Sequence, residues 1–216
     1  MPAREVWGLD IGQTALHAVK LRRIRGEAEI QDLYFQSLET DLDDPAYEEK
    51  LADALQAFAS RKQVGGTPVV ASLPGYTTLF RDFPLPSVSG SRLQEIVSYE
   101  AKQHIPFPLE EVVWDYHQLE EDEETGEVGV ALVSCRRDIV QGLLAMLDEA
   151  GLNIDALQVG PVGLVNYIRY ELEPEEPILV LDTGARGTDF IVLDGDSFWL
   201  RSIGVSGADL SKALMS

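Results

Sequence analysis

Leu9-Asp10-Ile11-Gly12-Gln13-Thr14 is the stretch that decides the fold, because a second stretch of the same form follows much later in the chain. The second stretch is Leu181-Asp182-Thr183-Gly184-Ala185-Arg186. Each ends an apolar run that is typical of a buried strand, and each leads into further strand-like sequence. The two stretches share few identical residues, but they share the same predicted order of strand, turn and strand. It predicts two similar hairpins within one α/β protein.

The residue types at these two turns suit phosphate chemistry. A glycine lets the backbone turn tightly and approach a ligand, so that the N–H groups of the turn point at phosphate oxygens. Asp10 and Asp182 would repel phosphate, but each can hold Mg²⁺ through water, since magnesium keeps much of its hydration. A single Asp-x-Gly usually marks an ordinary turn. Two of them on facing hairpins predict a clamp for a triphosphate and its metal.

The composition excludes several classes of protein. Of the 216 residues, 45% are hydrophobic and 25% are charged, as in an ordinary globular protein. The formal net charge of -20 repels phosphate backbones, so we expect no nucleic-acid partner. Cys135 is the only cysteine, and in its apolar strand we expect it to be a small buried residue. Without a run of signal-peptide or membrane-helix length, the sequence predicts a cytoplasmic protein with no direct membrane insertion.

The order of the predicted elements indicates an α/β sheet that carries a compact insert. Strands are predicted at residues 6–11, 15–21, 29–37, 69–73, 76–83, 112–119, 128–135, 155–159, 178–181, 190–193 and 198–203. Helices are predicted at about 43–65, 93–105, 139–150, 161–172 and 208–215. Because the last of these helices is short, the sequence predicts that the chain stops partway through a subdomain.

Both turns resemble the phosphate loops of actin-like ATPases. The first loop is 9–12 with Ala18-Val19, and the second is 181–185 with Thr188. Within that superfamily, in its FtsA and PilM branch, the chain resembles the N-terminal part of the type IV pilus assembly protein PilM family. The motifs that carry this resemblance run in family order across essentially the whole chain. They are Arg81-Asp82-Phe83-Pro84-Leu85-Pro86, Tyr99-Glu100-Ala101, His104-Ile105-Pro106-Phe107-Pro108, Trp114-Asp115-Tyr116, Arg136-Arg137-Asp138-Ile139-Val140 and Glu149-Ala150-Gly151-Leu152.

The resemblance implies an α/β, actin-like (ribonuclease H-like) fold. It implies subdomain 1A with an inserted subdomain 1C and the beginning of subdomain 2A. The first part of 1A would span 1–75, the insert 76–152, the return to 1A 153–176, and the truncated start of 2A 177–216. The implied cofactors are ATP and Mg, in a site that is incomplete within this chain.

The resemblance also implies which residues bind the nucleotide phosphates. They would be Asp10, Gly12, Gln13, Thr14, Asp182, Gly184, Ala185 and Thr188. The metal would be held through water by Asp10 and Asp182, and no catalytic residue is assigned.

Two departures from the family pattern bear on phosphate binding. Relatives generally carry a lysine seven residues after the first loop's aspartate, where this chain has His17. Lys20 comes three residues later and would face the other side of the strand, so it is a poor substitute. Gln13 replaces a small hydroxyl residue and would crowd the turn. We therefore expect weak nucleotide binding and at most a slow ATPase.

The resemblance implies a scaffold on the inner face of the inner membrane. Such a scaffold would bind the N-terminal cytoplasmic segment of a PilN-like inner-membrane protein, in a groove whose residues the sequence does not identify. Self-association is left open as a second interaction. Two alternatives share the fold: an actin-like ATPase or small-molecule kinase, and the cytoplasmic part of a type II secretion GspL-like protein.

Phe107 allows two interpretations. Pro106 and Pro108 could stiffen an exposed ridge that presents Phe107 to a partner. Alternatively, Pro106 ends the preceding helix and Phe107 packs into the core of the insert. We favour the second interpretation.

Overall fold

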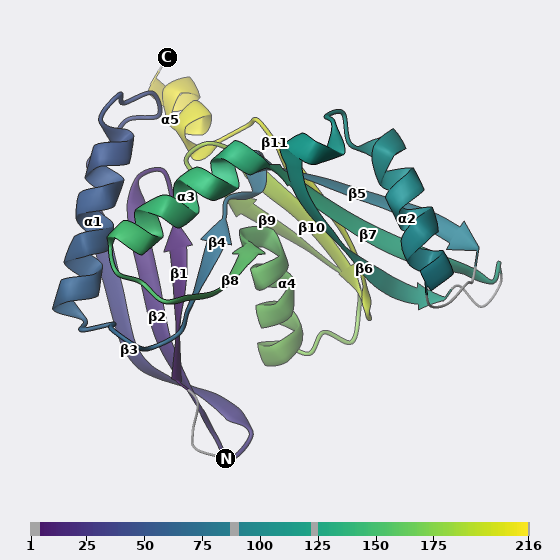
Figure 1. The fold of residues 1–216 in the computed structure, drawn as a ribbon, viewed down its shortest axis with the longest axis horizontal. Helices are drawn as coiled ribbons and strands as arrows, with labels where there is room; N and C mark the ends of the chain where they lie inside the picture. The colour runs from purple at the N-terminus through teal and green to yellow at the C-terminus, as the bar shows by residue number, and fades with distance from the viewer. Residues whose placement is uncertain (1–4, 87–90, 122–124, 216) are drawn as a thin grey trace.

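In the part of the chain that the structure describes, the strands form three β-sheets, and the helices cover or separate them (Figure 1). The computed structural model describes residues 5–86, 91–121 and 125–215. The main sheet contains the N-terminal strands, and two smaller sheets are formed by the insert and by the C-terminal strands. Figure 1 shows the two smaller sheets lying together on one side of the main sheet.

The main sheet has five strands in the order β3-β2-β1-β4-β8. These are β1 (Glu5–Ile11), β2 (Ala15–Ile24), β3 (Glu27–Ser37), β4 (Val69–Leu73) and β8 (Ile154–Val159). The first three form an antiparallel meander, whereas β4 and β8 run parallel to β1. The predicted meander at the front of an α/β sheet is confirmed.

Side-chain alternation along β1 gives the main sheet one core face and one cavity face. Trp7, Leu9 and Ile11 are buried, as the two-residue period of a strand requires when one face is covered. Their neighbour Asp10 is exposed on the other face. The apolar residues therefore fix which face meets the helices, and Asp10 faces away from that core.

Two helices cover the core face of the main sheet. They are α1 (Tyr47–Arg61) and α3 (Arg137–Glu149). Buried residues of α1 recur at Leu51, Ala54, Leu55 and Phe58, the spacing of a single helix face. The ring of Phe58 meets that of Trp7 edge-on, with 5.1 Å between the centroids. This aromatic pair anchors α1 to the first strand.

The insert is a three-stranded antiparallel sheet with one helix on it. Its strands are β5 (Thr78–Pro86), β6 (Val112–Glu121) and β7 (Glu127–Arg136), in the order β5-β7-β6. The helix is α2 (Ser91–His104), and short 3-10 turns, η1 (Gly75–Thr77) and η2 (Leu109–Glu111), precede β5 and β6. Residues of α2, β5 and β7 form a core of their own, which includes Phe83, Val97 and Leu132.

The favoured interpretation of Phe107 is wrong. Phe107 is 46% exposed, whereas Ile105 is 4% exposed and packs into the core of the insert. The helix ends before Pro106, so the chain leaves the core at that point and carries Phe107 outward. The apolar contact expected of Phe107 is made by Ile105.

The C-terminal sheet packs against the insert through a third core. Its strands are β9 (Ile178–Thr183), β10 (Thr188–Asp194) and β11 (Ser197–Ile203), and the helix α5 (Gly207–Met215) follows. The third core combines these strands with helix α4 (Gly160–Glu171) and the insert. An ion pair between Arg201 of β11 and Asp82 of β5, at 2.9 Å, lies at the same junction.

Strand β7 contributes to all three cores. Val130 and Leu132 face the core of the insert, and Ala131 between them faces the third core. At the end of the strand, Cys135 belongs to the first core, and its Sγ donates to the carbonyl of Thr77 at 3.3 Å. The predicted burial of Cys135 is confirmed, and burial raises the pKa of its thiol.

Helix α3 bears on the expected subdomain boundaries. It follows β7 directly, but Val140, Leu143 and Leu147 pack into the first core with α1. By its packing, α3 belongs to the layer over the main sheet, although it lies within the expected insert of 76–152. The boundaries at 75, 152 and 176 stay predictions.

Gly75 marks a close approach between η1 and the C-terminal sheet. A Cβ added at Gly75 would overlap with the carboxylate of Asp189 in β10. That carboxylate accepts a hydrogen bond from the hydroxyl of Ser202, so it is not free to swing aside. The junction therefore requires a residue without a side chain at position 75.

Gly75→Ala is expected to lower the free energy of unfolding by about 1–3 kcal/mol, the usual effect of overpacking. Urea unfolding measures this change. Gly142→Ala in α3 is the matched control, because a Cβ there meets nothing within 4 Å. That control should be neutral or stabilising, since alanine favours a helix over glycine. Equal stability of Gly75→Ala and wild type would show that the Asp189 carboxylate moves freely.

Candidate functional site

The two Asp-x-Gly turns have the same hydrogen-bonding geometry. The N–H of Gly12 donates to the carbonyl of Ala15 at 3.0 Å, and the N–H of Gly184 donates to that of Gly187 at 2.9 Å. Each turn joins two antiparallel strands, β1 to β2 and β9 to β10. The repeat seen in the sequence is thus a repeat in structure.

Register extends the correspondence beyond the turns. Asp10 lies opposite His17 on β2, and Asp182 lies opposite Asp189 on β10. In both hairpins the paired residue comes seven positions after the aspartate. The place that holds His17 in the first hairpin therefore holds a carboxylate in the second.

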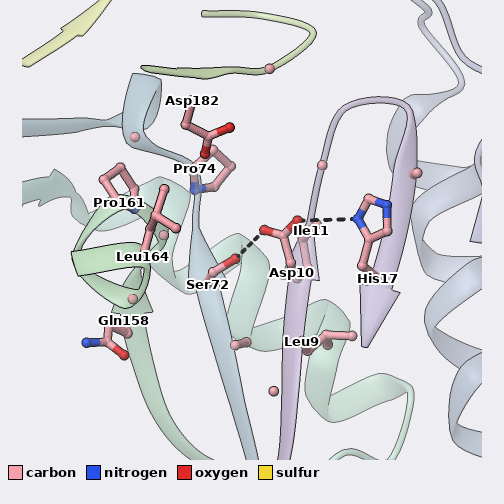
Figure 2. Close-up of a pocket in the computed structure, with 18 of the residues that line it drawn as sticks. Leu9, Asp10, Ile11, His17, Ser72, Pro74, Gln158, Pro161, Leu164 and Asp182 are labelled. Atoms are coloured by element: carbon pink, nitrogen blue, oxygen red, sulfur yellow. Dashed lines mark hydrogen bonds and ion pairs between the residues drawn. The ribbon is translucent and has the colours of Figure 1, made fainter. Parts of the chain in front are cut away.

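Both turns line one large cavity of about 1320 Å³. Figure 2 shows part of it, with Asp10, Ser72 and His17 on neighbouring strands of the main sheet and Asp182 on a separate C-terminal segment. The predicted site residues that line the cavity are Asp10, Gly12, Gln13, Thr14, Asp182, Gly184 and Ala185. The structure therefore brings residues that are about 170 positions apart in the sequence to one cavity.

Thr188 differs from the other predicted site residues. Its side chain is 6% exposed, and its hydroxyl donates to the carbonyl of Val205 at 2.7 Å. The hydroxyl oxygen of Thr188 also lies 3.3 Å from that of Thr183. Thr188 thus supports the second turn from behind, within the protein.

The side chain of Gln13 makes hydrogen bonds within the protein. It is 6% exposed, and its Nε2 donates to the carbonyls of Asp41 and Leu42, at 3.3 and 3.4 Å. The hydroxyl of Thr40 in turn donates to the carbonyl of Gln13. The residue expected to crowd the turn instead fastens it to the segment before α1.

Asp10 has partners on both neighbouring strands. The hydroxyl of Ser72 on β4 donates to its Oδ1 at 2.8 Å, and Nδ1 of His17 lies 3.4 Å from its Oδ2 (Figure 2). The ring of His17 also packs at a tilt on Phe35, with centroids 5.2 Å apart. Lys20 does not line the cavity and pairs with Glu5 at 2.6 Å, so it does not replace a cleft lysine.

The carboxylates fit a magnesium ion that comes with phosphates. Among the residues that the structure describes, no group of three or more His, Cys, Asp or Glu could hold a metal by itself. Mg²⁺ is usually held by one or two carboxylates together with waters and substrate phosphates. Asp10 and Asp182, from the two turns, supply that number of ligands.

Asp189 is a third carboxylate at the cavity. Burial raises its pKa, the hydrogen bond from Ser202 lowers it, and the negative charge of Asp182 raises it again. The net direction is upward. The folded protein therefore holds a proton on Asp189 more tightly than the unfolded chain does.

The raised pKa of Asp189 makes stability depend on pH. Its contribution is complete below the pKa of the unfolded chain and is lost as the pH rises through the folded pKa. Asp189→Asn removes this loss, so the stability of the variant relative to wild type should increase as the pH rises above about 4, the pKa of an unfolded aspartate. Urea unfolding at a series of pH values measures the difference. Parallel profiles for the two proteins would contradict the upward direction.

A second cavity, of about 360 Å³, lies where α1 and α3 meet η1. Its lining includes Leu51 of α1, Tyr76 and Thr77 of η1, and Ile139 and Leu143 of α3. Ile139 is 38% exposed, although it belongs to the apolar stripe by which α3 was predicted. The stripe that predicted α3 thus also contributes a residue to a cavity, and the sequence analysis assigned that residue no functional role.

Tyr47 and Tyr76 connect the two cavities. The Tyr47 hydroxyl donates to the carbonyl of Gly12 in the first turn at 3.4 Å, and Tyr47 also lines the second cavity. Burial, with a smaller effect from Tyr76, raises the pKa of Tyr47 to about 12. Tyr76 lines both cavities. Tyr47 is thus a neutral donor near pH 7, and the two cavities share a wall.

Comparison with known proteins gives a family and a fold. A family model described as type IV pilus assembly protein PilM matches residues 8–216. A chain of a PilM-PilN type IV pilus biogenesis complex matches with a TM-score of 0.78 and 29% identity, over 96% of this chain and 64% of that one. The present chain thus spans 64% of the length of that structure.

Two more distant structures bear on the fold alone. The cytoplasmic domain of EpsL, an inner membrane component of the type II secretion system of Vibrio cholerae, has a TM-score of 0.59 at 13% identity, over 98% of this chain and 75% of that one. A Bacteroides thetaiotaomicron protein with an actin-like ATPase fold has a TM-score of 0.57 at 10% identity, over 98% and 74%. The predicted α/β, actin-like fold is confirmed. In the described part of the chain, no helix is long and apolar enough to cross a membrane.

Proposed function

The chain belongs to the type IV pilus assembly protein PilM family, and we propose that it is a cytoplasmic scaffold of pilus assembly. In this proposal it binds the N-terminal cytoplasmic segment of a PilN-like inner-membrane protein and is thereby recruited to the inner face of that membrane. A nucleotide with Mg²⁺ in the large cavity adjusts the shape of the scaffold. The similarity to a chain of a PilM-PilN complex supports the partner class.

In this proposal, the partner's segment binds at the second cavity. It lies between two helices at the junction with the insert, and its walls are mainly apolar. Apolar pockets beside exposed backbone give short peptides both affinity and selectivity. Leu51, Ile139 and Leu143 would hold apolar side chains of the segment.

Charge favours the same partner. Cytoplasmic segments next to membrane helices are enriched in Lys and Arg. This chain has a net charge of -20, and the second cavity is lined by Glu48 and Asp138. A basic segment would therefore be attracted to the surface and oriented at the cavity, mainly through its association rate.

The large cavity supports nucleotide binding, and its residues divide into three roles. Asp10 and Asp182 would hold Mg²⁺, which neutralises phosphate charge when it is bound. Gly12 and Gly184 allow the backbone to approach the phosphates. Ser72 and His17 orient the Asp10 carboxylate. With histidine where relatives carry lysine, we expect weak binding and slow turnover at most.

His17→Lys is expected to strengthen binding of Mg·ATP by about tenfold or more. A hydrogen bond to a charged group is worth about 1.5–3 kcal/mol, and position 17 lies beside Asp10 at the cavity. Isothermal titration calorimetry measures the affinity. Arg22→Lys at the outer part of the same strand is the control, because Arg22 does not line the cavity. Unchanged affinity of His17→Lys would place the phosphates elsewhere.

Binding of the partner's segment is tested by fluorescence anisotropy of a labelled peptide from a PilN-like N-terminus. We expect saturable binding that is lost when the peptide is scrambled. Ile139→Asp should abolish binding, because it places a charge in the apolar wall of the second cavity. Leu144→Asp is the matched control on α3, since Leu144 is 36% exposed and lines neither cavity.

The outcomes separate the proposed functions. No binding by folded wild type, or equal loss in both variants, would contradict the second cavity as the partner site. Rapid ATP turnover that depends on Asp10 or Asp182 would favour the enzyme alternative over the scaffold. The likeness to EpsL supports the shared fold and gives no separate support for a type II secretion role.

A further inference from the structure

Arg186 lines the large cavity and contacts the segment before α1. It follows the second Asp-x-Gly turn, and its Nη2 donates to the carbonyl of Leu42 and lies 3.3 Å from Oδ1 of Asp43. Its guanidinium also lies over the ring of Tyr76, 6.0 Å from the centroid. One side chain thus joins the second turn to the segment before α1 and to η1.

Arg186 is a positive charge in a cavity whose other charged side chains are carboxylates. Asp10, Asp182 and Asp189 all line it, and Arg186 is the one lysine or arginine among the described residues that do so. A triphosphate brings several more negative charges. Its binding therefore requires a cation from the protein in addition to Mg²⁺, and arginine suits phosphate because its planar fork donates two parallel hydrogen bonds.

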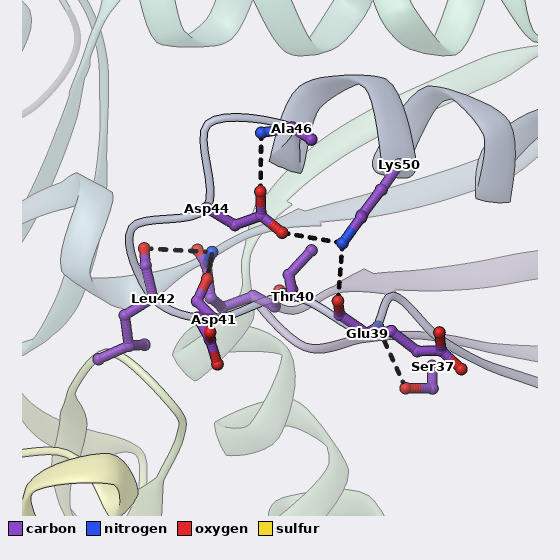
Figure 3. A network of polar contacts seen from close by, with 9 residues as sticks. Ser37, Glu39, Thr40, Asp41, Leu42, Asp44, Ala46 and Lys50 are labelled. Carbon is purple, nitrogen blue, oxygen red and sulfur yellow. Dashed lines mark hydrogen bonds and ion pairs between the residues drawn. The ribbon is translucent and has the colours of Figure 1, made fainter.

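The segment that Arg186 contacts is also the anchor of the first turn. Gln13 donates to the carbonyls of Asp41 and Leu42, and Leu42 is the residue whose carbonyl Arg186 contacts. Figure 3 shows how this segment continues into α1. Just before the helix, Asp44 accepts a hydrogen bond from the N–H of Ala46 at 2.8 Å and pairs with Lys50. Residues 41–44 therefore link both phosphate turns to the start of α1.

The contacts of Arg186 are of a kind that another anion can replace. The side chain of Asp43 is 98% exposed and that of Arg186 is 37% exposed. Exposed ion pairs contribute little to stability, because water screens them and two long side chains must be ordered. A phosphate in the cavity offers more negative charge and better geometry than the Asp43 carboxylate.

We propose that Arg186 is the phosphate-binding cation of the cleft, and that a triphosphate and residues 41–44 compete for its guanidinium. Binding would release residues 41–44 from the second turn and loosen the approach to α1. This inference rests on the proposed nucleotide site.

Isothermal titration calorimetry with Mg²⁺ and either inorganic triphosphate or ATP tests the role of Arg186. Inorganic triphosphate isolates the phosphate contacts from those to a nucleoside. Arg186→Gln is expected to weaken binding of both probes at least about tenfold. Arg201→Gln is the matched control, because it removes a cross-sheet ion pair away from the cavity. Thermal unfolding of each variant checks that it folds.

Competition is tested by freeing Arg186 without changing it. Asp43→Asn should strengthen binding of both probes, since it removes a competing acceptor. Asp41→Asn removes the same charge from the same segment without touching the Arg186 contact, and it should change affinity less. Hydrogen exchange gives an independent readout: amides of residues 41–44 should exchange faster when Mg²⁺ and triphosphate are added to wild type.

The outcomes distinguish this inference from the nucleotide site itself. If wild type binds neither probe, both fail. If wild type binds and Arg186→Gln binds equally well, the nucleotide site stands and the role of Arg186 is overturned. If Asp43→Asn and Asp41→Asn have the same effect, or if exchange at 41–44 slows with ligand, the competition is overturned. Should Arg186→Gln fail to fold, the two aspartate variants and the exchange experiment still decide.

Discussion

The amide hydrogen bonds of Gly12 and Gly184 are the constraint around which both walls of the large cavity are built. Each closes a hairpin two residues after an aspartate, and so it fixes where the strand ends and where the carboxylate lies. A Cβ on Gly12 would come within 3.0 Å of the Ala15 carbonyl, tighter than ordinary contacts allow. A side chain there would open the turn. Asp10 would then lose its position relative to Ser72 and His17.

Local periodicity explains what the sequence could predict. The stripe of Leu51, Leu55 and Phe58 predicted α1, and the apolar runs before each Asp-x-Gly predicted the two hairpins. The run before the first turn is buried as expected, whereas β9 before the second turn has no buried residue. These features depend on residues a few positions apart, where the two-residue and 3.6-residue periods decide burial. The repeat of the hairpins then indicated that both turns serve one site, and seven of the eight predicted residues line one cavity.

The features that the sequence could not predict depend on contacts between distant residues. Gln13 reaches carbonyls 28 and 29 positions away, and Arg186 reaches across more than 140. Nothing in the local pattern distinguishes these side chains from solvated ones. The second cavity arises where α1, η1 and α3 meet, so no single stretch encodes it. Phe107 shows the same limit, because Pro106 decides the direction of the chain and the hydrophobicity of Phe107 does not.

The position of strand β7 between the three cores has a consequence for how the protein unfolds. Its residues enter three cores, with Leu132 in one, Ala131 in the next and Cys135 in the third. Loss of packing in any of these cores removes support from a strand that the other two need. The layers should therefore melt together as one cooperative unit, and local openings should spare β7 until the whole fold is lost. An excised insert would lose two of these supports and expose the faces of β7 that they cover.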